Sequence, residues 1–200
     1  MLTDAEGDAS HSSGDDTGRG RHDPAAVLAF WFAPGNEVRW FRADPSFDAA
    51  IARRFTASVE AASRRELDGW AARPDGSLAL CLLLDQFPRN IWRGTPRAFS
   101  CDAMARAVAG AALAAGHDRD LTPAQRHFLF LPFEHSENLA DQERCVALMH
   151  DLGDAEMLDY AQRHRDVIAR FGRFPHRNAI LGRQSSPAEI EFLQQPGSSF

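Results

Sequence analysis

Apolar side chains recur every three or four positions along much of the chain, the spacing that places them on one face of an α-helix. The stripe from Phe47 to Ala62 follows this spacing through Ile51, Phe55 and Val59. The run Leu78–Leu84 is apolar on every face, which predicts a buried helix at the centre of the fold. Further helices are predicted over residues 100–115, 123–131, 137–151 and 155–171.

Helix starts are marked by a capping side chain followed by proline at the first helical position. The four such pairs are Asp23–Pro24, Asp44–Pro45, Thr122–Pro123 and Ser186–Pro187. Gln125 and Glu189 complete capping boxes at the last two. No segment alternates apolar and polar positions over a useful length, so strands are not predicted. The pattern predicts an all-α fold of about eight helices in stacked antiparallel hairpins.

The first 22 residues differ from the rest of the chain. They are rich in Gly, Ser and Asp and poor in large apolar groups, so we expect residues 1–22 to form a disordered acidic tail. Residues 23–200 are then a single helical domain with enough apolar content, 44% of the whole chain, to build a core. No apolar run approaches the ~20 residues of a membrane helix, and the start lacks the features of a secretory signal.

The cysteine and arginine content bears on the cellular compartment and on possible ligands. Cys81, Cys101 and Cys145 are widely spaced and form neither a disulfide framework nor a metal-binding pair, so we expect a reducing cytoplasm. All 22 basic residues are arginine, which a GC-rich genome explains without any phosphate-binding function. The net charge of -6 argues against nucleic-acid binding, although residues 163–183 carry six arginines against Asp166.

His164 occupies the middle of an apolar stripe. Met157, Ala161, Ile168 and Phe171 surround it at helical spacing, so the imidazole is expected on the core-facing side of its helix. A buried imidazole needs a partner or stays uncharged. It is therefore either a core histidine bonded to a carbonyl or carboxylate, or a proton-transfer group in a pocket between helices.

The junction from Phe133 to Asn138 contains His135 between Glu134 and Glu137. Carboxylates beside an imidazole are used in acid–base chemistry and in metal sites. The second histidine of a zinc-protease helix is missing, and so is the P-C-x-x-C of zinc deaminases. The other interpretation is a helix junction: Pro132 ends one helix, and Ser136 caps the next.

Asp85 and the residues after it form a third group. Asp85 directly follows the buried apolar run, where an unpaired carboxylate is costly, so an arginine partner is expected. The cationic stretch 170–183 is an obvious source of that arginine. Gln86, Arg89 and Asn90 accompany Asp85.

The stretch Arg170–Ser186 concentrates four arginines and His176 without an acid among them. Arg173 and Arg177 either neutralise Asp85, Glu134 or Glu137 in a structural ion-pair network, or supply surplus charge that clamps a carboxylate or phosphate. The sequence leaves both alternatives open.

Two of these segments share a short sequence pattern. Phe87–Ile91 reads F-P-R-N-I, and Phe174–Ile180 reads F-P-H-R-N-A-I. Each Phe-Pro pair follows a predicted helix that the proline is expected to end, because the residue before proline is driven out of helical geometry. Each then presents an Arg-Asn pair at the helix exit.

Several established motifs are absent. The sequence has no G-x-G-x-x-G, no P-loop and no G-x-S-x-G nucleophile elbow. It points to no metal and leaves any cofactor undetermined.

The longer motifs resemble the bacterial family known as domain of unknown function 924. The resemblance runs from about Val27 to the C-terminus. It is strongest in Trp31–Phe32, Trp40–Phe41, Leu83–Asn90, Pro132–Glu137, and Arg170–Asn178 onward to Arg183. It implies a tetratricopeptide-like helical fold and no particular activity.

We therefore expect one pocket that binds a small anionic ligand, with Arg89, Arg177 and Arg183 as the clamp and with acid–base chemistry if a reaction occurs. The alternative is a tetratricopeptide-like scaffold whose arginines bind an acidic peptide; binding of structured RNA ranks last. The predicted proton-transfer residues are His135 or His164, paired with Glu137. The predicted ligand-binding residues are Asp85, Arg89, Asn90, Arg173, His176, Arg177, Asn178 and Arg183.

Overall fold

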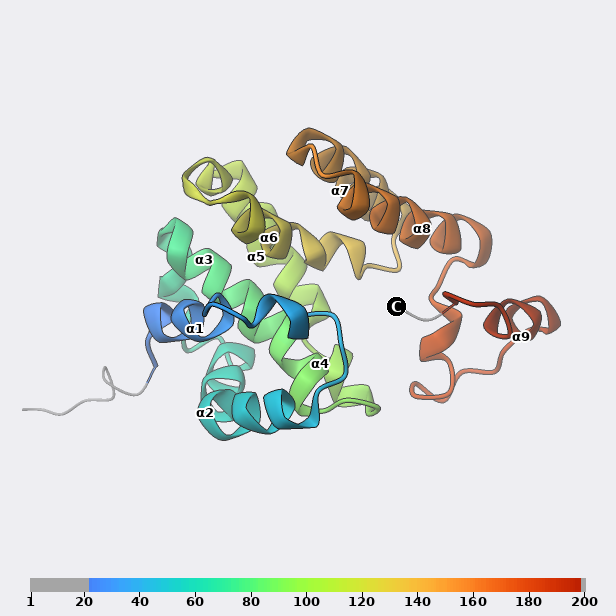
Figure 1. Ribbon diagram of the computed structural model, residues 1–200, viewed down its shortest axis with the longest axis horizontal. Coiled ribbons are helices and arrows are strands. Elements are labelled where there is room, and N and C mark those ends of the chain that lie inside the picture. Colours follow the sequence, from blue (N-terminus) through green and yellow to red (C-terminus); the bar gives the residue numbers. More distant parts are fainter. Residues whose placement is uncertain (1–21, 199–200) are drawn as a thin grey trace, which may run out of the picture.

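The computed structural model describes residues 22–198, and all regular structure in that range is helical (Figure 1). The predicted tail therefore lies outside the described residues, apart from His22. The α-helices are α1 (Pro24–Trp31), α2 (Pro45–Ser63), α3 (Pro74–Cys81), α4 (Phe87–Ile91), α5 (Asp102–Ala114), α6 (Pro123–Glu134), α7 (Leu139–Leu152), α8 (Ala155–Phe171) and α9 (Pro187–Leu193). Short 3₁₀ turns are η1 (Glu37–Arg39), η2 (Asp68–Ala72), η4 (Pro96–Phe99), η5 (His117–Asp120) and η6 (Pro175–Arg177).

The π-turn η3 (Leu82–Gln86) joins α3 to α4, so the two α-helices and the turn form one continuous helix. Counted this way, the described residues contain 8 helices besides the 3₁₀ turns, and the predicted all-α fold is confirmed. Within residues 22–198, none of the helices combines the length and the apolar character that crossing a bilayer requires.

The predicted helix starts are confirmed at atomic level. Asp44 accepts hydrogen bonds from the amides of Ser46 and Phe47 at 2.9 and 3.1 Å. Both capping boxes form, one at the start of α6 and one at the start of α9. These bonds satisfy amide groups that have no partner inside the helix.

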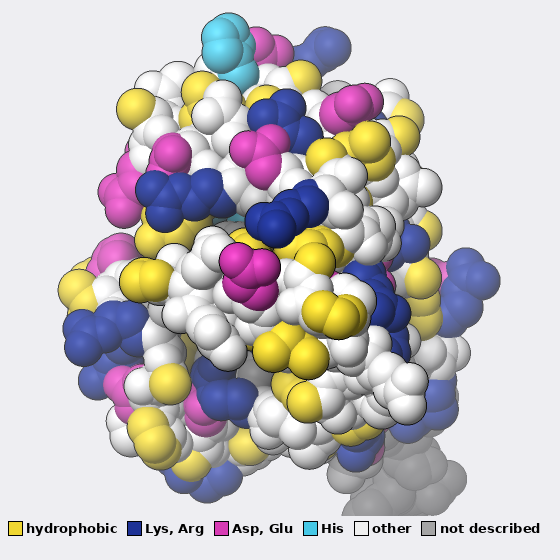
Figure 2. Space-filling model, turned by 90° about the vertical axis from the view of Figure 1, so that its right-hand side faces the viewer, with side chains coloured by type: hydrophobic (Ala, Val, Ile, Leu, Met, Phe, Trp, Pro, Cys, Tyr) yellow, Lys and Arg dark blue, Asp and Glu magenta, His cyan; other side chains and the backbone are white. Residues whose placement is uncertain are grey.

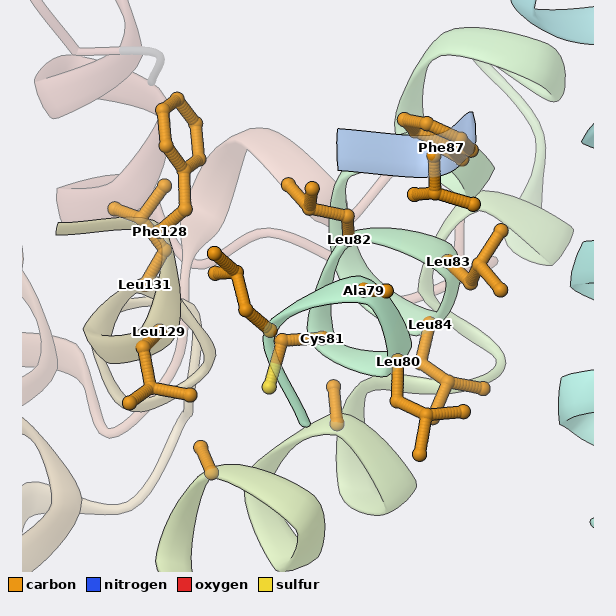
Figure 3. Close-up of a cluster of buried hydrophobic side chains, with 14 of the residues drawn as sticks. Ala79, Leu80, Cys81, Leu82, Leu83, Leu84, Phe87, Phe128, Leu129 and Leu131 are labelled. Atoms are coloured by element: carbon orange, nitrogen blue, oxygen red, sulfur yellow. The ribbon is translucent and has the colours of Figure 1, made fainter. Parts of the chain in front are cut away.

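The apolar run Leu78–Leu84 lies at the centre of the fold, as predicted. Every side chain in it is at most 2% exposed. Helices α1, α5 and α6 pack against α3, and α2 packs against η3 (Figure 3). Phe128, Leu129 and Leu131 of α6 belong to the same buried core cluster as this run. Burial of these side chains is the main stabilising term of the fold.

Pro88 does not end its helix, contrary to the prediction. The ring of a proline inside an α-helix collides with the carbonyl four residues earlier and cannot donate to it. The π-turn η3 removes this conflict, since the Phe87 amide bonds to the Leu82 carbonyl five residues back. The helix therefore continues to Ile91 and keeps Asp85 and Arg89 one turn apart on it.

The junction between α6 and α7 also differs from the prediction in detail. Helix α6 includes Pro132 and ends at Glu134. The N-cap of α7 is Asn138, whose side chain accepts from the Ala140 amide at 2.8 Å. Ser136 instead donates to Asp141 at 2.7 Å. His135 is the C-cap of α6 and lies in this junction.

Helices α5 to α8 pack in chain order, each against the next. Helices α7 and α8 form a hairpin through Gly153, whose φ of 81° favours glycine. The core-facing stripe of α8 is confirmed, with Ala161, His164 and Ile168 buried. Beyond α8 the chain turns back, and η6 and α9 (red in Figure 1) lie at the end of that helix around a small cluster that includes Phe174.

Candidate functional site

His135 is held by a buried carboxylate. Its Nδ1 lies 2.8 and 2.9 Å from the two carboxylate oxygens of Asp85, a side chain only 1% exposed. Burial alone would raise the pKa of Asp85, but Arg89 and His135 hold it well below its usual range. A carboxylate only accepts hydrogen bonds, so His135 Nδ1 carries the proton. Burial and Arg89 lower the pKa of His135, which leaves its Nε2 unprotonated near neutral pH.

The expected arginine partner of Asp85 comes from its own helix. Arg89 Nη1 lies 3.1 Å from an Asp85 carboxylate oxygen, whereas the cationic stretch 170–183 was the predicted source. Arg89 also forms a two-bond ion pair with Asp102 at 2.9 and 3.0 Å. Two carboxylates therefore neutralise this guanidinium.

The positive charge of Arg177 is less fully paired than that of Arg89. Its Nη1 lies 3.5 Å from Asp102, whose two oxygens are already bound by Arg89, and donates to the His135 carbonyl at 3.1 Å. Its Nε is buried and has no hydrogen-bond partner among the described residues. The guanidinium is stacked near the rings of Phe99 and Phe174, at 4.7 and 4.5 Å. Burial, then Arg89, lowers the pKa of Arg177 to about 10.

Glu137 pairs with Arg183 and not with His135. Two hydrogen bonds of 2.7 and 2.9 Å join their side chains. Glu137 also accepts from the Phe174 amide at 2.9 Å, while Arg183 donates to the Phe174 carbonyl at 3.0 Å. This pair ties the α6–α7 junction to the segment that carries Arg177, and so fixes Arg177 relative to His135.

These elements surround one open depression of about 320 Å³, which we call the η4–η6 pocket. Its charged or titratable lining residues are Asp102, Arg106, His135, Glu137 and Arg177, and the rest are Pro96, Phe99, Ser100 and Leu181. Within the described part of the chain, His135 Nε2 forms no hydrogen bond. The pocket thus combines a fixed imidazole with an incompletely paired guanidinium.

A second buried group lies behind this pocket. Glu134 Oε1 is 3.6 Å from His164 Nδ1, and both side chains are about 6% exposed. Burial, then Asp85, raises the pKa of Glu134 to about 8, and burial lowers that of His164 to about 3. His164 Nδ1 also lies 2.8 Å from the Tyr160 carbonyl oxygen. His164 is therefore a neutral core histidine that does not line the pocket.

Other predicted residues have partners elsewhere. Asn90 donates to Asp48 of α2 at 2.8 Å, because the continuous helix turns it away from Arg89. Arg173 pairs with Glu189 of α9 at 2.6 and 2.9 Å. Asn178 donates to Ser185 at 3.0 Å. Asn90 therefore joins α4 to α2, Arg173 and Asn178 hold the C-terminal segment together, and none of the three lines the pocket.

His176 is half-buried beside the Phe174 ring, with a centroid distance of 5.5 Å. Burial, then Arg177, lowers its pKa to about 4. It is uncharged near neutral pH and is not among the residues that line the pocket.

Sequence reasoning missed Asp102, Phe99 and Arg106. Asp102 is the carboxylate that both Arg89 and Arg177 approach, yet in sequence it is only an acidic residue near the start of an alanine-rich helix. The preference of helix N-termini for acids explains such a residue completely. No local signal distinguishes it.

The arginines of residues 163–183 do not form an uninterrupted basic surface. Four of them are paired with carboxylates, namely Arg163, Arg165, Arg173 and Arg183. On the face that carries the C-terminal segments, basic and acidic side chains lie interspersed with hydrophobic ones (Figure 2). Among the described residues, no group of three or more His, Cys, Asp or Glu side chains is arranged to hold a metal ion.

Comparison with known proteins identifies the family. A family model described as "Bacterial protein of unknown function (DUF924)" matches residues 27–197, so the chain belongs to this family. The chain is similar to the solved structure of a protein of unknown function, ATU0120, from Agrobacterium tumefaciens. The two share 44% identity and a TM-score of 0.82, over 86% of this chain and 96% of that one. No curated protein matches the sequence.

Proposed function

We propose that this DUF924 member binds a small anionic ligand in the η4–η6 pocket through Arg177, with His135 as the proton acceptor or donor. One observation carries the proposal: a buried guanidinium that is incompletely paired lines the same pocket as a histidine fixed by a buried carboxylate. Buried charges in proteins are normally paired, and an incompletely paired one favours an anion.

The electrostatics of Arg177 support binding of an anion rather than a cation. Burial and the neighbouring Arg89 both disfavour its positive charge. An anion beside the guanidinium would reverse both effects, because it replaces lost hydration and offsets the repulsion between two arginines. Arg89 and Arg183 are committed to carboxylates, so the predicted clamp reduces to Arg177.

The state of His135 supports acid–base chemistry in the same pocket. Asp85 fixes the ring through Nδ1 and would stabilise the imidazolium that forms when Nε2 takes up a proton. A proton taken from a bound ligand would therefore go to Nε2. The side chain is 16% exposed, enough for contact with a ligand at the pocket wall.

The alternative of a tetratricopeptide-like scaffold receives less support. A groove for peptides would spread aromatic and basic groups along a concave face, whereas the η4–η6 pocket brings Phe99, Arg106 and Arg177 into one depression. We also propose that the protein works in a reducing cytoplasm, since Cys81, Cys101 and Cys145 are all buried free thiols.

The proposal can be tested by titrating ¹⁵N-labelled full-length protein with acetate and, separately, with inorganic phosphate. We expect saturable shifts of the Arg177 Nε–H signal and a higher pKa of His135 with the anion bound. Arg177→Met removes that signal, and it should abolish the anion-dependent rise in the pKa of His135. Arg170→Met is the matched control: it also removes one positive charge, but from an exposed side chain of the same region.

Far-ultraviolet circular dichroism of both variants would establish that they remain folded. Shifts that never saturate, or a pKa of His135 that still rises with the anion in Arg177→Met, would exclude Arg177 as the anion-binding group.

A further inference from the structure

The walls of the η4–η6 pocket suggest which anion it takes. We infer that the ligand is a small monocarboxylate with an apolar chain, its carboxylate on Arg177 and its chain against Phe99 and Leu181. This inference rests on the proposed function and adds the chemical class of the ligand. Three features support it: the charges around the pocket, the apolar part of its lining and its size.

The charges around the pocket leave no second positive group for a dianion. Arg89 and Arg183 are each engaged by a carboxylate through two hydrogen bonds. Arg106, the other arginine in the lining, lies 3.3 Å from Asp141. Arg177 has the longest of these contacts, 3.5 Å to Asp102, and both oxygens of that carboxylate are already bound by Arg89. One negative charge is therefore matched by the site, and a second one is not.

Two acidic side chains in the pocket lining further disfavour a doubly charged ligand. Asp102 and Glu137 both border the pocket, so a doubly charged phosphate or dicarboxylate would bring its second charge near fixed carboxylates. Like charges a few Å apart in a partly buried site repel strongly. A monoanion can place its single charge on Arg177 and keep the rest of the molecule neutral.

The remaining wall is apolar. Pro96, Phe99 and Leu181 line the same pocket, and the Phe99 ring also stacks near the Arg177 guanidinium. A carboxylate bound by Arg177 would therefore have an apolar surface beside it. Leu181 is 36% exposed, so a ligand chain could cover part of it and remove apolar area from water. A volume of about 320 Å³ is near the lower end for ligand pockets and indicates a small molecule.

The test compares dissociation constants, by isothermal titration calorimetry at neutral pH, for acetate, butyrate, hexanoate, succinate, inorganic phosphate and butyramide. Affinity should rise from acetate to butyrate by about fourfold for each methylene that the apolar wall covers. Succinate, which has the carbon number of butyrate and a second charge, should bind at least about fivefold more weakly than butyrate. Butyramide, the neutral analogue, should not bind.

Leu181→Ser separates the two parts of the site. Its side chain is partly exposed, so the variant should fold, and the gain in affinity from acetate to butyrate should be lost. Succinate or phosphate binding as tightly as butyrate would overturn the inference and leave the proposed anion site intact. So would an affinity that does not depend on chain length. Saturation by none of the anions would instead overturn the proposed function, and this inference with it.

Discussion

The two Phe-Pro segments, Phe87–Ile91 and Phe174–Ile180, share a sequence pattern and meet at the same place in the fold. Both phenylalanines are completely buried. Their arginines, Arg89 and Arg177, both lie near the ring of Phe99 and both approach Asp102. Yet Arg89 binds Asp102 through two hydrogen bonds of 2.9 and 3.0 Å, and Arg177 stays 3.5 Å away.

The difference comes from the backbone around each proline. Pro88 lies inside a helix that a π-turn preserves, so Arg89 extends from one turn beyond Asp85 and reaches both acids. Pro175 begins a 3₁₀ turn after α8 has ended at Phe171, and Arg177 approaches Asp102 from this turn. Arg89 binds both oxygens of Asp102, and Arg177 approaches one of them only to 3.5 Å. The same short pattern therefore yields a structural ion pair in one copy and an incompletely paired charge in the other.

The largest expected effect comes from Arg89→Met, which removes the well-paired arginine. Asp85 and Asp102 would lose their main partner, and breaking a buried ion pair in this way typically costs about 3–5 kcal/mol. Urea denaturation would give the free energy of unfolding. The matched control is Arg93→Met, which breaks a two-bond ion pair with Asp48 from a half-exposed arginine of the same region. It should cost less than about 1 kcal/mol; equal losses would contradict a special role for Arg89.

A smaller effect is expected from Glu134→Gln, and it should depend on pH. The folded protein keeps a proton on Glu134 up to about pH 8, whereas the unfolded chain releases it near the ordinary value of 4.5. The free energy of unfolding should therefore fall as pH rises between those values, by at most about 1.4 kcal/mol per unit. Glutamine mimics the protonated form and removes this dependence.

Urea denaturation of wild type and Glu134→Gln at pH 5, 6, 7 and 8 measures that contribution. We expect the variant to gain stability relative to wild type as pH rises. Parallel curves would mean that Glu134 is ionised in the folded protein.

The smallest effect is expected from Arg177→Met. The variant loses one hydrogen bond to the His135 carbonyl and two ring contacts, but it also relieves an incompletely paired buried charge. Replacing such a charge by an apolar side chain of similar volume is often nearly neutral, so we expect a change within about 1–2 kcal/mol. A loss as large as that of Arg89→Met in the same urea assay would show that both copies are structural.

The sequence determined the fold class and most helix starts, because these depend on local physics. Apolar spacing sets which face of a helix is buried, and a capping oxygen with a following proline fixes where it begins. The buried position of His164 follows from the same spacing, and that of Leu78–Leu84 follows from a run that is apolar on every face. The π-turn was not predicted. A helix can accommodate a proline in two ways, by ending before it or by widening one turn, and tertiary packing selects between them.

The sequence also indicated which segments form the site. From it we predicted that the following residues lie near one another: Asp85, Arg89, His135, Glu137, Arg177 and Arg183. Only the tertiary structure decided which acid meets which base. In the structure, His135 pairs with Asp85, Glu137 pairs with Arg183, and Asp102 pairs mainly with Arg89. Ion pairing depends on distances of a few Å between residues far apart in the chain, and composition and spacing do not encode those distances. The incomplete pairing of Arg177 follows from these distances, because Arg89 lies closer to Asp102 than Arg177 does.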